Sequence, residues 1–141
     1  MTAITAAPTT VTAPGKIRHR ILWTLQIVLG LFFIIASGGP KLVIPHTLME
    51  NNATAFSIPF ALLVFIGVAE VAGGIGLMVP RLASPAAIGL AIVTFLAAGF
   101  NLFLTGTPEL APFPLALTAI FAWIAYERRD SITTLRTPFN R

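Results

Sequence analysis

Glu70 is the residue of this sequence whose type and surroundings most directly imply chemistry. It is the only charged residue in the apolar run from Ile58 to Val79, a run that can cross a bilayer as a helix rising about 1.5 Å per residue. A carboxylate near mid-membrane depth costs at least ~2.5 kcal/mol, so it should face protein or water rather than lipid. Its side chain can donate or accept a proton there, which makes Glu70 the candidate catalytic residue.

Glycines surround Glu70 on the predicted helix. Gly67, Gly73 and Gly74 lie at i−3, i+3 and i+4 from the acid and share its face. Small-xxx-small spacing, which lets a neighbouring backbone approach, occurs at Ala69/Gly73 and Ala72/Gly76. Because burial disfavours the charged form of a carboxylic acid, we expect a neutral acid unless Lys41 reaches it. The alternative is that the glycines serve helix packing alone and the protonated acid is merely tolerated.

Lys41 is the cation considered as a partner of Glu70. Counting about 1.5 Å per residue from the basic helix ends places four residues, one from each helix, at the same depth in the membrane: Gly30, Glu70, Thr94 and Thr118. The same count separates the backbones of Lys41 and Glu70 by more than a lysine side chain can span. A pair would require the Gly38–Pro40 segment to dip inward. Two interpretations of Lys41 are therefore equally good: its side chain extends to the membrane interface, or it lines a cavity inside the bundle.

Polar side chains at helical spacing predict two interior stripes. The first is Gln26, Gly30, Phe33 and Ser37, and the second is Thr94, Ala98, Asn101 and Thr105. Amides, hydroxyls and ammonium groups can hydrogen-bond an oxygen of a small ligand. The candidate ligand-binding residues are Gln26, Lys41, Thr94 and Asn101. We expect no metal site, since the chain has no cysteine and His46 has no second histidine nearby.

The composition is that of a membrane protein with one domain. The 141 residues are 56% hydrophobic and 10% charged, with a mean hydropathy of +0.88, whereas soluble domains carry about 25% charged residues. A net charge of +4 could indicate nucleic acid. However, the basic residues lie at membrane edges, so the expected partner is the lipid bilayer and not nucleic acid.

The apolar runs predict an all-α, integral-membrane four-helix bundle with antiparallel up-down topology. The expected helices are about 18–37, 58–79, 85–105 and 112–126, within a transmembrane domain over 16–128. The flanks, 1–15 and 129–141, are expected to be a disordered tail and a cytoplasmic tail. The first span should stop at Gly38-Gly39-Pro40, because proline cannot continue the hydrogen-bond ladder, and 41–57 should lie at the interface. The length of the first apolar run favours an uncleaved helix over a signal peptide.

Basic residues predict the orientation. Eight lie on one side of the expected bundle: Lys16, Arg18, Arg20, Arg81, Arg128, Arg129, Arg136 and Arg141. The other side has only Lys41. The excess of positive charge predicts that both termini are cytoplasmic.

Three segments resemble the DoxX-like membrane proteins: Ser37–Leu42 (S-G-G-P-K-L), Ile66–Arg81 (I-G-V-A-E-V-A-G-G-I-G-L-M-V-P-R) and Gly89-Leu90. The resemblance covers about residues 18 to 128. It implies a multi-pass four-helix protein of the bacterial inner membrane, and some relatives are membrane subunits of quinone-linked oxidoreductases. The family's lysine and acid fall on Lys41 and Glu70. Many relatives carry a histidine where this chain has Asn101, so a titrating role does not transfer to that position.

Two classes of function fit these residues. In the first, the bundle docks a quinone or other small lipophile for a soluble oxidoreductase or stress-response partner. In the second, it is a proton-coupled small-solute permease, or a membrane assembly or stability factor without catalytic activity. No phosphate loop, nucleophile triad or dinucleotide motif is present. The chain would thus be at most the membrane subunit of an enzyme, with no covalently bound cofactor. Four short helices can also associate as a homodimer.

Overall fold

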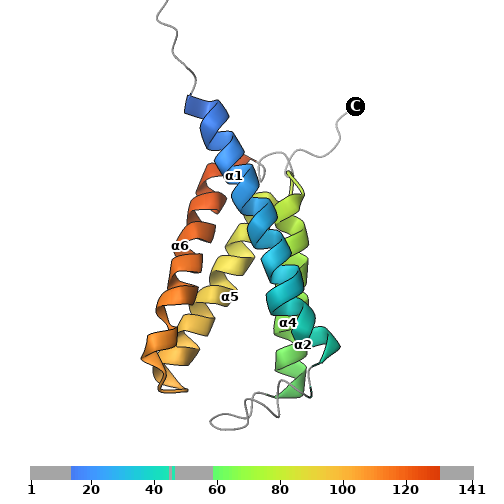
Figure 1. Ribbon diagram of the computed structural model, residues 1–141, viewed down its shortest axis with the longest axis vertical. Coiled ribbons are helices and arrows are strands. Elements are labelled where there is room, and N and C mark those ends of the chain that lie inside the picture. Colours follow the sequence, from blue (N-terminus) through green and yellow to red (C-terminus); the bar gives the residue numbers. More distant parts are fainter. Residues whose placement is uncertain (1–13, 45, 47–58, 131–141) are drawn as a thin grey trace, which may run out of the picture.

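The computed structural model of the chain describes residues 14–44, 46 and 59–130 and is helical in the part described (Figure 1). The elements are α1 (Pro14–Leu31), the π-helix η1 (Phe32–Gly38), α2 (Gly39–Val43), α4 (Phe60–Met78), α5 (Ala83–Phe103), the 3-10 turn η2 (Pro108–Leu110) and α6 (Pro112–Glu127). Four helical stretches of these residues are long and apolar enough to cross a membrane. The predicted four-helix membrane bundle is confirmed. The expected tails, 1–15 and 129–141, lie outside the described residues except at 14–15, where α1 already begins, and at 129–130. Most of the expected interfacial segment also lies outside them.

The first span does not end at Gly38-Gly39-Pro40, so that prediction is wrong. The chain instead passes through a π-helix, η1, and continues as α2 to Val43. The Gly39 N–H donates to the Ile34 carbonyl, a five-residue step. This wider turn moves the helix carbonyls relative to the Pro40 ring, which would clash in a regular α-helix. Residue 39 must be glycine, because a Cβ there would lie 2.4 Å from the Ile34 oxygen.

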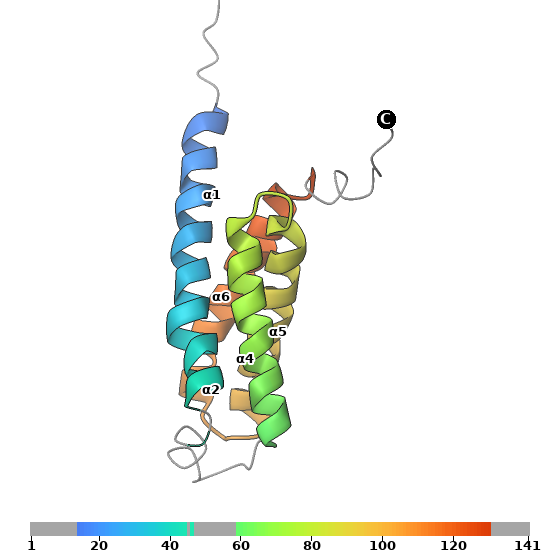
Figure 2. The same ribbon diagram turned by 90° about the vertical axis from the view of Figure 1, so that its right-hand side faces the viewer.

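Both described ends of the chain lie at one end of the bundle (Figure 1). An ion pair between Arg18 of α1 and Glu127 of α6 joins them. The α4–α5 turn, which carries Arg81, lies at the same end, and α1 extends beyond the other helices there (Figure 2). Six of the seven Lys and Arg residues of the described chain, all except Lys41, therefore gather at this end, here called the basic end.

The basic end is predicted to face the cytoplasm. Because the chain has no cysteine, single cysteines can report the topology directly. A cysteine replacing Thr107, at the opposite end, should react with an impermeant maleimide added outside intact cells. A cysteine replacing Leu82, which is 43% exposed in the α4–α5 turn, should react only after the membrane is permeabilised. The reverse pattern would overturn the orientation.

The core of the bundle is apolar, and so is much of its outer surface. Phe33 of η1 meets Phe121 of α6 edge to face, with ring centroids 5.3 Å apart. Leu77 and Ile124 are fully buried beside them. Large apolar side chains also cover the outside, with Phe103 at 85% exposure. An apolar belt of this size on a helical bundle is what lipid contact requires.

Glycines set the distance between the first span and α4. A Cβ built on Gly30 would lie 2.7 Å from the Gly74 carbonyl oxygen, and one built on Gly74 would lie 2.7 Å from that of Gly30. Gly38 and Gly67 form a second pair of the same kind, at 2.8 and 3.2 Å. Each backbone fills the space that a side chain on the other would need, so the two helices pack in direct backbone contact.

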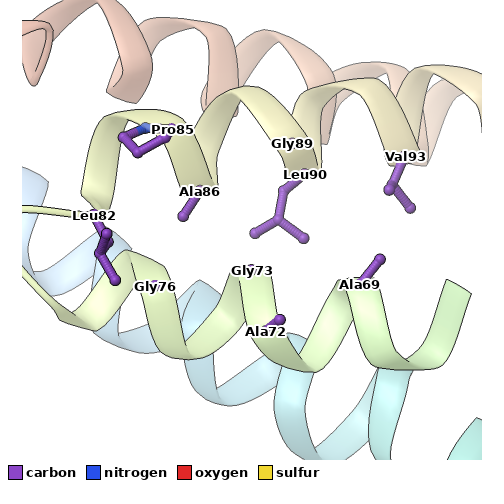
Figure 3. A pocket seen from close by; sticks show the side chains of 10 residues that line it. All are labelled: Ala69, Ala72, Gly73, Gly76, Leu82, Pro85, Ala86, Gly89, Leu90 and Val93. Atoms are coloured by element: carbon purple, nitrogen blue, oxygen red, sulfur yellow. The ribbon is translucent and has the colours of Figure 1, made fainter. Parts of the chain in front are cut away.

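The opposite side of α4 packs on α5. Gly73 faces α5 rather than the side of Glu70 that meets α1, because a Cβ there would lie 2.7 Å from the Leu90 side chain. Small residues leave an apolar groove of about 320 Å³ between the two helices (Figure 3). Its lining residues include Ala69, Ala72, Gly76, Ala86 and Gly89. The small-xxx-small spacing of α4 therefore serves contact with α5.

Candidate functional site

Lys41 and Glu70 form an ion pair between α2 and α4. Lys41 Nζ lies 2.5 Å from Glu70 Oε2 and 3.2 Å from Ser37 Oγ. The Glu70 side chain is 7% exposed and that of Lys41 is 23% exposed. The depth count that separated the backbones of Lys41 and Glu70 by more than a lysine side chain is wrong, and so is its premise that Gly30 is level with Glu70. Glu70 therefore has a partner in Lys41.

The register of the two helices explains this reach. Gly30 packs on Gly74 and Gly38 on Gly67, so Glu70 is level with the middle of η1, about one turn beyond Gly30. The count from the basic flank failed because α1 extends past the other helices (Figure 2). Lys41 lies directly over Gly67, where a Cβ would be 2.9 Å from its own Cβ. Its side chain spans the single helical turn back to Glu70.

The pair has chemical capacity beyond mutual neutralisation. An ammonium group has three N–H donors, and the described residues accept two of them, at Ser37 and Glu70. The third can donate to the oxygen of a ligand. The hydrogen bond between an ammonium and a carboxylate also places an exchangeable proton at the pair. A paired lysine and acid are much less costly inside a membrane than either charge alone.

Thr94 lies at the depth of Glu70, on α5. Gly73 packs on Leu90, and one further helical turn along each antiparallel helix brings Thr94 level with the acid. The Thr94 and Thr118 hydroxyls lie 2.9 Å apart and join α5 to α6. Each also contacts a carbonyl oxygen of its own helix, that of Leu90 or Pro114. The described contacts of Thr94 thus hold α5 against α6.

Asn101 lies further from the basic end than Glu70. It follows Thr94 by seven residues of α5, about 10 Å along the helix. Its side chain is half-buried, and its Nδ2 donates to the Leu110 carbonyl at 3.4 Å. Its own carbonyl accepts from Thr105 Oγ1 and from the Thr107 N–H. Asn101 therefore holds the turn between α5 and η2, and a role toward a ligand stays a prediction.

Gln26, another candidate ligand-binding residue, is 1% exposed near the basic end. Its Nε2 donates to the Leu77 carbonyl at 3.1 Å. Its Oε1 accepts from Arg128 Nε at 3.2 Å and Nη2 at 3.0 Å. Burial lowers the pKa of Arg128 from its ordinary value, although the nearby Glu127 opposes this. Gln26 thus connects α1, α4 and α6 and holds a partly buried arginine.

Gln26→Leu is expected to destabilise the bundle by about 1–3 kcal/mol, because the Leu77 carbonyl and the Arg128 guanidinium would both lose a partner. Thermal unfolding in detergent measures this loss. In a double-mutant cycle, Arg128→Met should cost less in the Gln26→Leu background than in the wild type. Equal costs in the two backgrounds would show that the two side chains are not coupled.

Sequence reasoning did not identify Arg128 or Ser84 as interior partners. Ser84 is fully buried, and its Oγ donates to the Ala125 carbonyl at 3.0 Å. Both contacts join α6 to residues distant in sequence, so helical periodicity gives no signal for them. Within the described part of the chain, no three His, Cys, Asp or Glu side chains are grouped so that they could hold a metal ion.

A protein-family model, that of the DoxX-like family, matches residues 24–124. The matched range includes the Lys41–Glu70 pair, the two threonines that join α5 to α6, and Asn101. No curated protein and no solved structure matches the chain. The family match covers well over half of the sequence and runs through all four spans of the bundle. This small membrane protein belongs to the DoxX-like family.

Proposed function

We propose that this chain is a multi-pass protein of the bacterial inner membrane that docks a quinone or other small lipophile for a soluble redox or stress-response partner. The observation that carries the proposal is the Lys41–Glu70 pair with Ser37 beside it. The pair provides a hydrogen-bond donor and an exchangeable proton within an apolar bundle. Binding sites for small apolar ligands commonly combine an apolar lining with a few such polar groups.

A quinone fits this chemistry better than a polar solute. Its carbonyl oxygens accept hydrogen bonds, and its ring and tail partition into the bilayer. Lys41 is the more exposed member of the pair, at 23%, so the ammonium is the group that an incoming carbonyl oxygen would meet. Two-electron reduction of a quinone takes up two protons. In this proposal the soluble partner supplies the two electrons. The Lys41–Glu70 pair delivers one proton to a ligand oxygen and is reprotonated from water at the membrane interface, which also supplies the second proton.

The proposal is tested by the quinone content of protein purified from native membranes in mild detergent. Solvent extraction followed by mass spectrometry should find a quinone in the wild type. Lys41→Met should retain less than about a tenth of it, the loss expected for a charge-assisted hydrogen bond. Arg81→Met is the matched control, because it also removes one cation, at an exposed site, and it should retain the wild-type content. Equal content in all three proteins, or none in any, would refute the proposal.

A further inference from the structure

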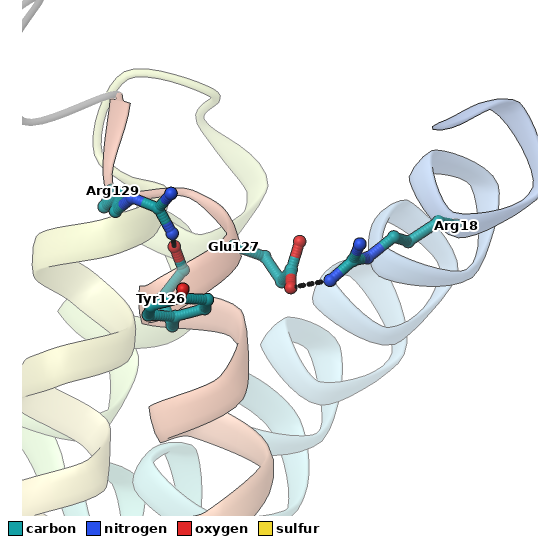
Figure 4. Close-up of polar contacts among 4 residues, drawn as sticks. All are labelled: Arg18, Tyr126, Glu127 and Arg129. Atoms are coloured by element: carbon teal, nitrogen blue, oxygen red, sulfur yellow. Dashed lines mark hydrogen bonds and ion pairs between the residues drawn. The ribbon is translucent and has the colours of Figure 1, made fainter. Parts of the chain in front are cut away.

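The basic end carries more positive charge than its own acids neutralise. The described residues there include six cations, Lys16, Arg18, Arg20, Arg81, Arg128 and Arg129, and two acids, Glu127 and Asp130. Some of these cations have protein partners. Arg18 pairs with Glu127, and Arg129 donates to the Tyr126 carbonyl and lies over its ring (Figure 4). The remaining cations are therefore the ones to consider for an external anion.

Two of them share a face of α1. Lys16, His19, Arg20 and Trp23 lie at i, i+3, i+4 and i+7, so their side chains leave the helix on one side. The Trp23 and His19 part of this face meets Arg128. The Arg128 Cζ lies 5.7 Å from the Trp23 ring centroid, and its Nη1 lies 3.5 Å from His19 Nδ1. Lys16 and Arg20 continue the same face outward from Arg128, and both are exposed.

Arg128 is held in place at the base of this face. Gln26 Oε1 accepts from its Nε and Nη2, and the Trp23 ring lies against its guanidinium. An arginine has five N–H donors, and the described contacts use three of them. The other two can donate to an anion without disturbing the contact with Gln26. A fixed arginine with two exposed cations beside it is suited to a phosphate group.

We propose that Lys16, Arg20 and Arg128 bind the phosphate of an anionic phospholipid headgroup in the leaflet at the basic end. Two neighbouring features favour a lipid over free phosphate. Ile17 and Ile21 are 70% and 50% exposed next to Arg20, so acyl chains can pack beside the headgroup. Trp23 is also of the residue type enriched at membrane interfaces. The inference is independent of the quinone site, which lies further along the first span.

Native mass spectrometry of the full chain, titrated in detergent with phosphatidylglycerol or phosphatidylcholine, tests this site. The wild type should prefer phosphatidylglycerol. The double variant Lys16→Gln/Arg20→Gln should bind phosphatidylglycerol about 25-fold more weakly, or about fivefold for each cation lost. The control, Arg81→Gln/Arg129→Gln, removes the same charge from the same end and should weaken binding by no more than about threefold. Both pairs of side chains are exposed, so both variants are expected to fold.

Three results would overturn the proposal. Equal losses in the two double variants would mean that diffuse charge attracts the lipid. Equal binding of the two lipids by the wild type would mean that the headgroup is not recognised. Displacement of phosphatidylglycerol by millimolar inorganic phosphate would mean that the cations take free phosphate rather than a lipid.

Discussion

Glu70→Leu is expected to destabilise the bundle by about 2–3 kcal/mol and to lower the yield of folded protein, whereas Glu70→Gln is expected to stay close to the wild type. Leucine would leave the Lys41 ammonium inside the bundle with Ser37 as its described partner. Removing one member of a buried ion pair costs about 3–5 kcal/mol. The 23% exposure of Lys41 lets it turn toward the interface and reduces this cost to about 2–3 kcal/mol. Glutamine keeps an oxygen that can accept from Lys41, although it carries no charge.

Thermal unfolding in detergent and the yield of monodisperse protein measure this difference. Glu109→Leu is the matched control, because it makes the same replacement at an exposed acid of η2 and should leave stability within about 0.5 kcal/mol of the wild type. Wild-type stability of Glu70→Leu would contradict the account, since it would mean that the acid does not hold Lys41 in the membrane.

Alanine at the glycine contacts between the first span and α4 is expected to have the second large effect. In Gly74→Ala the new methyl group would lie 2.7 Å from the Gly30 carbonyl oxygen and 2.9 Å from Ile34 Cγ1. The oxygen belongs to a helix backbone and cannot rotate away, so the helices must separate. Overpacking of this kind costs about 1–3 kcal/mol, which thermal unfolding in detergent would show.

Gly89→Ala and Gly99→Ala are the controls for this prediction. Both glycines lie in α5, and a Cβ at either position meets no atom within 4 Å. Alanine there should be neutral or stabilise the helix by up to about 1 kcal/mol. Gly67→Ala should differ from Gly74→Ala in one respect. Its methyl group would meet Lys41 Cβ at 2.9 Å, so it should disturb the ion pair as well as the packing.

Sequence alone predicts the bundle well because membrane spans have a strong local signal. Four apolar runs, and the grouping of Lys16, Arg20 and Arg81 at one end, follow from composition and position in the chain. The burial of Glu70 also follows, since a lone acid in an apolar run must face inward. The polar stripe of the first helix predicted that Gln26 faces the interior, and the Gln26 side chain is indeed only 1% exposed.

The sequence could not predict the register between helices. Lys41 reaches Glu70 because Gly38 packs on Gly67, a contact that depends on how far α1 extends past its neighbours. The break predicted at Pro40 is absent for a related reason. Local propensity ends a helix at Gly-Gly-Pro, but packing against α4 keeps the chain helical through a π-turn. Gln26 bonds Arg128, 102 residues away, a partner that periodicity along one helix cannot identify.

Affinity for a short-chain quinone, measured by equilibrium dialysis on purified protein, tests the central role of the Lys41–Glu70 pair most directly. The wild type should bind saturably, and Lys41→Met and Glu70→Gln should each bind about 10- to 100-fold more weakly, the range for a lost charge-assisted hydrogen bond. The double variant should bind hardly more weakly than either single variant, because the two side chains act as one unit. Wild-type affinity in all three variants, or no saturable binding by the wild type, would contradict the account.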